Sequence, residues 1–194
     1  MPPDHFLKSP SRAAVSRRAF LRRMGALSLL GATPVISGPA LAGVRVYERE
    51  IALDHTHTLE KVQLVYALND DYIPPALRQL NVFLRDHYSG AIGTMDPALY
   101  DQLNQIRTLL NTKGSFEVIS GYRDPKTNEH LRKTRGGGVA KNSLHMYGKA
   151  IDVRLPGVPL AELRDAAISL NAGGVGYYPT EQFIHVDTGK VRTW

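Results

Sequence analysis

The sequence predicts an α+β fold in which helices pack on a small, mostly antiparallel β-sheet. Alternating apolar and polar residues over 44–48 and 61–66 indicate a β-hairpin. Two further short segments, 175–178 and 183–187, indicate a closing pair of strands. Between these pairs apolar residues recur at helical spacing, and the sequence contains no internal repeat.

Two helices are expected to follow the hairpin. Pro74 opens the first, because proline is tolerated in the first turn of a helix, and Ser89 with Gly90 ends it. Asp96 and Pro97 start the second, since an N-cap aspartate followed by proline is a helix-start signal. The apolar face of each helix would then pack on the sheet.

The rest of the chain is expected to alternate between short strands and helices. Apolar, β-branched segments predict strands over 116–120 and 150–155. Helical periodicity predicts helices over 126–134 and 159–170.

Composition limits the chemistry that is available to the chain. Its 194 residues include no cysteine, which excludes disulfide bonds, thiolate metal sites and a thiol nucleophile. Hydrophobic residues make up 43% and charged residues 22%, as in ordinary globular proteins. A metal ion would therefore have to bind histidine and carboxylate side chains.

The net charge of +6 does not indicate nucleic-acid binding. Six of the 24 basic residues and one of the 18 acidic residues lie in residues 1–42. The remainder therefore carries 18 basic and 17 acidic residues, with no excess positive charge to neutralise phosphates. We expect no nucleic-acid partner, and we expect a monomer.

The first 42 residues have the pattern of an export signal. Residues 16–21 read Ser-Arg-Arg-Ala-Phe-Leu, residues 24–32 are apolar, and small residues at 40–42 suit a signal peptidase. The arginine pair followed by Phe-Leu resembles a twin-arginine signal. We expect a signal peptide over 1–42 and a periplasmic domain over 43–194, which contacts the membrane only during export. The alternatives are a membrane anchor and a disordered basic tail.

The segment 143–152 carries the most informative pattern. His145 and Asp152 are seven positions apart, and Gly148 between them allows the chain to turn so that both side chains reach one point. Asp152 lies in an apolar strand, where an unpaired carboxylate would be costly. A metal ligand role and an ion pair with Arg123 or Arg154 both satisfy this requirement.

A second pattern lies in the last predicted strand. His185 and Asp187 alternate with apolar residues, so they share one face of the strand. Together with His145 and Asp152, His185 completes a set of two nitrogens and one oxygen. Such a set suits Zn²⁺ with a fourth position open for water, although a lone strand histidine can also be purely structural.

Four motifs resemble a family of zinc peptidases when taken as a set. They are Ser-Gly-Tyr-Arg at 120–123, Ser-x-His-x-x-Gly-x-Ala-x-Asp at 143–152, Gly-Gly-x-Gly-Tyr-Tyr-Pro at 173–179 and Phe-x-His-x-Asp-Thr-Gly at 183–189. The set resembles the D-Ala-D-Ala carboxypeptidase and murein endopeptidase group, which shares its active-site plan with lysostaphin, and in particular murein endopeptidase K-like proteins. The resemblance covers most of residues 45–194 and implies a Hedgehog/DD-peptidase-like fold.

The resemblance also implies roles for individual residues. His145, Asp152 and His185 would bind Zn²⁺. Arg123 would contact the substrate, since its planar guanidinium grips a carboxylate or a developing oxyanion. The alternative for Arg123 is a surface turn residue.

Two further residues are candidates for substrate binding. Ser143 would orient the loop of His145 and border the substrate, although a capping role is equally compatible with its position. Tyr177 would line the cleft with Tyr178, although both phenols could instead pack within the sheet.

Two acidic residues are candidates for the general base. Many relatives in the wider group carry an acid three positions before the last metal ligand, where this chain has Gln182. Asp187 is our first candidate because it shares a strand face with His185, and Glu181 is the other. Asp187 could instead hydrogen-bond a metal ligand and orient it, without contacting the metal itself.

The resemblance implies a zinc-dependent murein endopeptidase that hydrolyses amide bonds in peptidoglycan stem peptides or cross-links. A D,D-carboxypeptidase and a non-catalytic cell-wall-binding module of the same fold are the alternatives. His55 and His57 also offer nitrogen ligands. This pair lies far in sequence from these motifs, and we expect it to be polar hairpin surface or a structural pairing.

Overall fold

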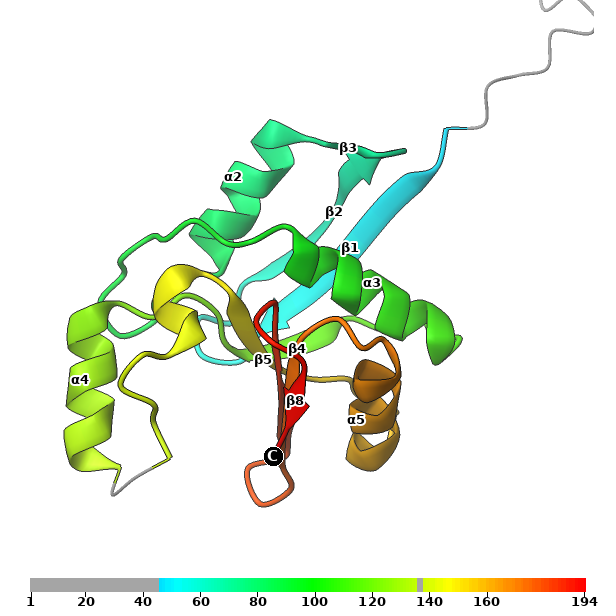
Figure 1. The fold of residues 1–194 in the computed structure, drawn as a ribbon. Helices are drawn as coiled ribbons and strands as arrows, with labels where there is room; N and C mark the ends of the chain where they lie inside the picture. Colours follow the sequence, from blue (N-terminus) through cyan, green and yellow to red (C-terminus); the bar gives the residue numbers. More distant parts are fainter. Residues whose placement is uncertain (1–45, 136–137) are drawn as a thin grey trace, which may run out of the picture. The chain divides into compact units, whose positions relative to one another are not determined.

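The computed structural model describes residues 46–135 and 138–194, so the export signal expected over 1–42 lies outside the described residues. Figure 1 shows the elements in chain order. They are β1 (Glu48–His55), β2 (Lys61–Leu68), β3 (Asp71–Tyr72), α2 (Pro74–Phe83), α3 (Ala98–Leu109), β4 (Phe116–Ser120), α4 (Pro125–Thr134), a 3-10 helix (Leu144–Tyr147), β5 (Ala150–Arg154), α5 (Leu160–Ser169), β6 (Gly174–Tyr178), β7 (Phe183–Asp187) and β8 (Arg192–Thr193).

The strands form one mixed sheet in the order β3-β2-β1-β4-β5-β7-β6-β8. The α+β class is as predicted, and five of the seven described strand pairs are antiparallel, but the sheet is mixed and is not small. The sheet has eight strands in the described residues, and the β1–β4 and β6–β8 pairs are parallel. The first parallel pair arises because α2 and α3 carry the chain across the sheet between the hairpin and β4.

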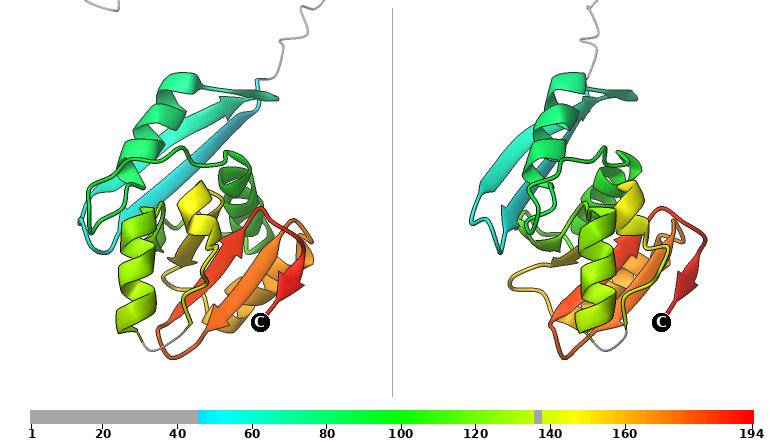
Figure 2. Two further views of the ribbon diagram at one scale, coloured as in Figure 1. Left: turned by 60° about the vertical axis from the view of Figure 1, so that its left-hand side comes forward. Right: turned by 90° about the vertical axis from the view of Figure 1, so that its left-hand side faces the viewer.

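The helices cover the sheet from both sides. Helix α2 packs on β2, α3 packs on β1 and α5, and α5 packs on β6 and β7. Figures 1 and 2 show α4 and the 3-10 helix on one side of β5, β6 and β7, with α5 on the other. The apolar core includes Ile151, Val153 and Val186 from the central strands. No helix in the described ranges is long and apolar enough to cross a bilayer.

Helix α2 ends at Phe83, six residues before the predicted end. The fully buried Leu84 closes it, and the chain then turns toward the segment after β4. Two hydrogen bonds join these segments: the Tyr122 amide donates to the Leu84 carbonyl at 2.8 Å, and the Asp124 amide donates to the Asp86 carboxylate at 2.8 Å. The first of these bonds satisfies the Leu84 carbonyl, which a longer helix would have satisfied internally.

Candidate metal centre and active site

One row of residues crosses four neighbouring strands and forms the floor of the site. Ser120 pairs with Asp152, Asp152 with His185, and His185 with Gly176. Side chains of one cross-strand row share a face of the sheet, so Asp152 and His185 project together. The neighbouring row, which includes Ile151 and Val186, projects into the core instead.

Three possible metal ligands converge above this floor. One ligand atom each from His145, Asp152 and His185 lies within 4.8 Å of the others, and no other group of this kind occurs in the described residues. His145 Nε2 is 3.2 Å from Asp152 Oδ2, and His185 Nδ1 is 2.9 Å from Asp152 Oδ1. Two ring nitrogens and a carboxylate oxygen around one point are a donor set that fits Zn²⁺.

His145 is held in the orientation that such a site needs. Its Nδ1 is 2.7 Å from the carbonyl oxygen of Gly121, so Nδ1 carries the proton and Nε2 faces Asp152. The 3-10 helix that carries His145 ends at Gly148, which has a φ of 65°. A Cβ at position 148 would collide with the Thr94 carbonyl, so only glycine allows the turn that leads into β5.

His185 is oriented by Asp187. Its Nε2 is 3.2 Å from Asp187 Oδ2, which leaves Nδ1 directed toward Asp152. A histidine that donates its second ring N–H to a carboxylate has a fixed tautomer and is a stronger metal ligand.

Asp187 itself is completely buried and saturated with donors. Its Oδ1 accepts the amides of Gly174 at 3.0 Å and Gly189 at 2.8 Å, and Arg192 donates to both carboxylate oxygens. Burial opposes its ionisation, but these hydrogen bonds together lower the pKa of Asp187 below its usual range. Asp187 does not line the cleft. This geometry fits the orienting role better than the proton acceptor role that we expected first.

The charges of the three candidate ligands are strongly coupled. Burial lowers the pKa of His145. Burial also acts on His185, but hydrogen bonds to Asp152 and Asp187 outweigh it and raise the pKa of His185 to about 9. Burial opposes ionisation of Asp152, yet its contacts with His145 and His185 outweigh burial and lower its pKa. The site thus favours a carboxylate beside a positive charge.

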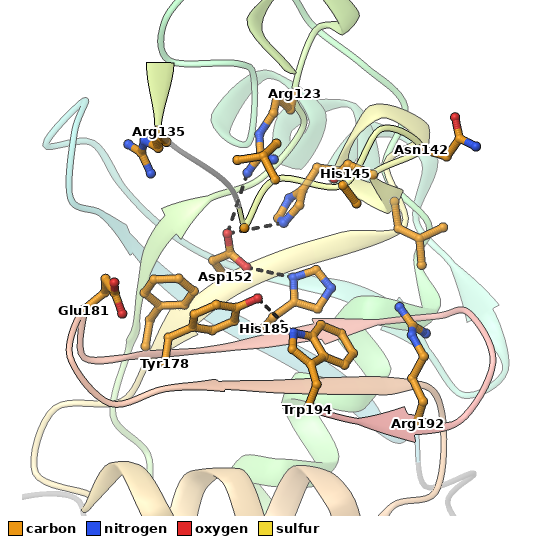
Figure 3. A pocket seen from close by; sticks show the side chains of 16 residues that line it. Arg123, Arg135, Asn142, His145, Asp152, Tyr178, Glu181, His185, Arg192 and Trp194 are labelled. Atoms are coloured by element: carbon orange, nitrogen blue, oxygen red, sulfur yellow. Dashed lines mark hydrogen bonds and ion pairs between the residues drawn. The ribbon is translucent and has the colours of Figure 1, made fainter. Parts of the chain in front are cut away.

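The candidate ligands lie at the base of a cleft of about 480 Å³. Figure 3 shows Arg123 and Arg135 on one side of Asp152 and His185, with Tyr178 and Trp194 on the other. Ser143 also lines the cleft, at the start of the 3-10 helix. The Ser143 hydroxyl makes no capping bond, so the structure gives no support to the capping alternative.

Arg123 lies between α4 and the metal ligands. Its guanidinium donates to Asn128 Oδ1 and Ser120 Oγ, both at 3.3 Å, and one nitrogen is 3.9 Å from Asp152 Oδ2. Its side chain is only 14% exposed, which does not fit the surface-turn alternative. Burial lowers the pKa of Arg123, but it stays a cation at neutral pH.

Tyr177 does not reach the cleft. It pairs with the core residue Ile184, is packed against the core, and has the Arg164 guanidinium 4.6 Å from its ring centroid. The substrate-binding role expected for Tyr177 therefore conflicts with its position. Its neighbour Tyr178 lies on the opposite face of β6 and lines the cleft.

The turn before β7 contains both Glu181 and Gln182. Gln182 has a φ of 60° and its side chain donates to the Pro179 carbonyl, so it is turned away from the ligands. Glu181 lines the cleft, and among residues 46–135 and 138–194 Asp152 is the only other acidic residue that does so.

The pair His55 and His57 is structural, as expected. His55 is 2% exposed, and its Nδ1 accepts the amides of His57 at 3.2 Å and Thr58 at 3.4 Å. The ring of His57 stacks on that of His87 with centroids 4.1 Å apart. Sequence reasoning assigned no role to Arg135 or to Gly121, because their parts in the site depend on long-range contacts.

Comparison with known proteins identifies the family. Residues 44–194 match the model of a peptidase family described as "Peptidoglycan L,D-endopeptidase MepK". The chain is 39% identical over 180 residues to the peptidoglycan L,D-endopeptidase MepK of Escherichia coli strain K12, covering 92% of this chain and 97% of that protein. It is 44% identical over 147 residues to the probable peptidoglycan L,D-endopeptidase MepK of Haemophilus influenzae, covering 75% and 78%. This similarity spans the candidate ligands, the cleft and the sheet that carries them, and the chain belongs to the MepK family of peptidases.

Proposed function

We propose that this chain is a zinc-dependent endopeptidase that hydrolyses L,D-amide bonds in peptidoglycan. One observation carries the proposal: His145, Asp152 and His185 converge in a cleft of a chain that belongs to a peptidase family. The names of its relatives specify the L,D bond. The resemblance of the motifs to zinc peptidases specifies zinc, which the donor set fits.

In this proposal the ligand set holds the metal through His145 Nε2, His185 Nδ1 and the Asp152 carboxylate. Bound zinc would supply Lewis acidity toward the scissile carbonyl and would acidify a water molecule. The Gly121 carbonyl and the Asp187 carboxylate keep the two imidazoles in the required tautomers.

Glu181 is the proposed proton acceptor. In the described part of the chain it is the one acidic residue lining the cleft that is not a candidate ligand. A general base must come within hydrogen-bond reach of the water that it activates, and Asp187, with both oxygens occupied by other donors, has no such access.

Arg123 is the proposed substrate contact. Its guanidinium is fixed by Asn128 and Ser120 beside the ligand set, so it does not have to be ordered when the substrate binds. It would bind a substrate carboxylate or stabilise the oxyanion that develops on the scissile carbonyl. Ser143 would border the same part of the cleft.

The place of action follows from the substrate. Peptidoglycan lies outside the cytoplasmic membrane, so we propose a periplasmic enzyme exported by the twin-arginine route, with a signal over 1–42 and a mature domain over 43–194. A monomer is sufficient, because all the proposed residues come from one chain.

Digestion of purified sacculi tests the proposal. We expect the protein to release fragments cut at L,D bonds, to lose this activity with a chelator, and to recover it with Zn²⁺. His145→Ala should be inactive, whereas His130→Ala, which changes an exposed histidine on α4, should be fully active. Release of terminal D-alanine alone would indicate a carboxypeptidase instead. Binding to sacculi without any cleavage would indicate a wall-binding module.

A further inference from the structure

Three aromatic residues form a wall of the cleft beside the metal ligands. We call Tyr178, Phe183 and Trp194 the aromatic wall. The rings of Tyr178 and Phe183 stack with centroids 4.6 Å apart and an angle of 18° between their planes. The Trp194 indole N–H donates to the Tyr178 hydroxyl at 2.9 Å. Figure 3 shows Tyr178 and Trp194 on the side of Asp152 and His185 that is opposite to Arg123.

Trp194 is the residue of the wall that lies next to the proposed reaction centre. Its ring centroid is 5.3 Å from that of His185. The ring lies directly on strand β6, where a Cβ at position 176 would be only 2.7 Å from it, so Gly176 makes room for the indole. The side chain therefore occupies the end of the cross-strand row that contains Asp152 and His185.

Several contacts fix the position of Trp194. Its backbone amide and carbonyl pair with Val175 at 3.3 Å and with Tyr177 at 3.0 Å, which extends β8 along β6. The Arg192 guanidinium lies 4.8 Å from the ring centroid. With the bond to Tyr178, these contacts leave the indole little freedom to turn.

Although it is fixed in this way, Trp194 remains 50% exposed, and its exposed surface faces the cleft. A rigid, exposed aromatic surface within a binding cleft is typical of a ligand contact, because little entropy is lost when a ligand covers it. The opposite side of the cleft carries the cations Arg123 and Arg135. The cleft is therefore mainly aromatic on one side of the candidate metal ligands, where the Arg192 guanidinium is paired with Asp187, and carries two cations on the other side.

We propose that the aromatic wall is a substrate subsite, which packs against the hydrocarbon side chain of the stem-peptide residue next to the scissile bond. This inference rests on the proposed endopeptidase function and adds the direction in which the peptide lies. The hydrocarbon chain covers Trp194, and the carboxylate of the neighbouring residue points toward Arg123. A peptide in the reverse direction would place its hydrocarbon chain on two cations and its carboxylate on the aromatic wall, where the guanidinium of Arg192 is already paired with Asp187. This arrangement is unfavourable at both ends.

The sequence offers a direct probe of the subsite, because Trp194 is its only tryptophan. The zinc-loaded protein would be titrated with a cross-linked stem-peptide dimer in which a methyleneamine replaces the scissile amide. We expect the peptide to shield the indole, so that quenching of its fluorescence by acrylamide falls about twofold or more, as expected when half or more of the exposed surface of Trp194 becomes covered. A matched peptide with alanine in place of the long side chain should shield it much less.

Kinetics of the zinc-loaded enzyme give a second measurement. Trp194→Ala should raise KM for the natural dimer about tenfold, as expected for loss of one apolar contact, with kcat and zinc content nearly unchanged. Trp194→Phe should lie in between. Tyr47→Ala, which removes an aromatic side chain that is 63% exposed outside the cleft, is the control and should match the wild type. Shortening the substrate side chain should weaken binding to the wild type but not to Trp194→Ala.

The outcomes separate the subsite from the enzyme function. If the wild type cleaves the dimer, but Trp194→Ala has an unchanged KM and the peptide does not shield the indole, the subsite is refuted and the enzyme stands. If the wild type with zinc cleaves nothing while the peptide still shields Trp194, the endopeptidase function is refuted and the binding surface stands. Shielding by a free disaccharide, with none by peptide, would overturn the proposal in favour of a sugar-binding surface.

Discussion

His185 Nε2 lies 3.2 Å from Asp187 Oδ2, two positions further along the same strand. This contact turns the other ring nitrogen of His185 toward Asp152. A carboxylate that could have been a catalytic base instead contacts the ring of a candidate metal ligand, on the side away from Asp152. Its remaining acceptor positions are filled by the amides of Gly174 and Gly189 and by Arg192.

Asp187→Asn should therefore weaken zinc binding and leave the chemical step nearly intact. Loss of an outer carboxylate on a metal-bound histidine costs about 10- to 100-fold in metal affinity. We expect zinc to be lost at lower chelator concentrations and the activity to recover in excess zinc. Asp70→Asn, in an exposed turn, is the control. If kcat at saturating zinc fell as far as in a base-deleted enzyme, Asp187 would be the base after all.

Glu181→Gln should have the opposite effects: it should slow the chemical step and leave zinc binding intact. Removing the proton acceptor should lower kcat by a factor of about 100 or more, with zinc content and thermal stability unchanged. The control is Glu162→Gln, on helix α5 and outside the cleft. Full activity of Glu181→Gln would exclude it from the mechanism.

The convergence of the three candidate ligands can be predicted from the sequence because the evidence is local. His145, Gly148 and Asp152 lie within ten residues, and strand alternation alone places His185 and Asp187 on one face. Alternation cannot decide which face of β6 lines the cleft. The sequence therefore predicts a substrate-binding role for Tyr177, whereas its neighbour Tyr178 lines the cleft. The role of Asp187 depended on donors from Gly174 and other distant positions, which no local pattern reveals.

Helix α2, which is shorter than predicted, and strand β8 show a second limit of prediction from the sequence. The helical pattern continues past Phe83, but the segment after Phe83 is not helical. Its Leu84 carbonyl and Asp86 carboxylate accept hydrogen bonds from the amides of Tyr122 and Asp124 instead. Strand β8 has only two residues, too few for any period to appear.

Gly148→Ala should destabilise the protein strongly. Position 148 has a φ of 65°, and a Cβ there would also collide with the Thr94 carbonyl. Gly157→Ala is a matched control, because Gly157 has a φ of 83° but nothing within 4 Å of an added Cβ. We expect the control to lose roughly 1 kcal/mol from backbone strain and Gly148→Ala to lose clearly more, together with zinc affinity. Denaturant unfolding would measure the difference, and equal losses would contradict the proposed collision.

The cluster of His55, His57 and His87 should make the fold sensitive to acid. Burial, followed by the charge of His57, lowers the pKa of both His55 and His87 to about 4. The unfolded chain therefore binds more protons than the folded one between pH 6.5 and 4, so stability is present above pH 6.5 and is lost as the pH falls through this window. Glu60 opposes this effect at His55, Asp86 opposes it at His87, and Arg85 and Arg123 add to it.

Melting temperatures between pH 7 and 4.5 test this expectation. The wild type should lose several degrees on acidification, and His87→Gln should lose less, because one of the two buried proton sites is gone. His130→Gln, which changes an exposed histidine on α4, should follow the wild type. Parallel curves for all three proteins would show that the cluster does not control acid stability.

The pairing of β5 with β7 has a consequence for how the protein matures. Asp152 and His185 are 33 positions apart and meet only when these two strands are joined. The unfolded chain has no such site, so a metal that binds here selects the folded state. At a free zinc concentration one hundred times its dissociation constant, this selection adds about 2.7 kcal/mol to the stability of the fold. Zinc depletion would then do more than abolish the activity. It would also shorten the lifetime of the protein, because more of the chain would be unfolded and open to proteases.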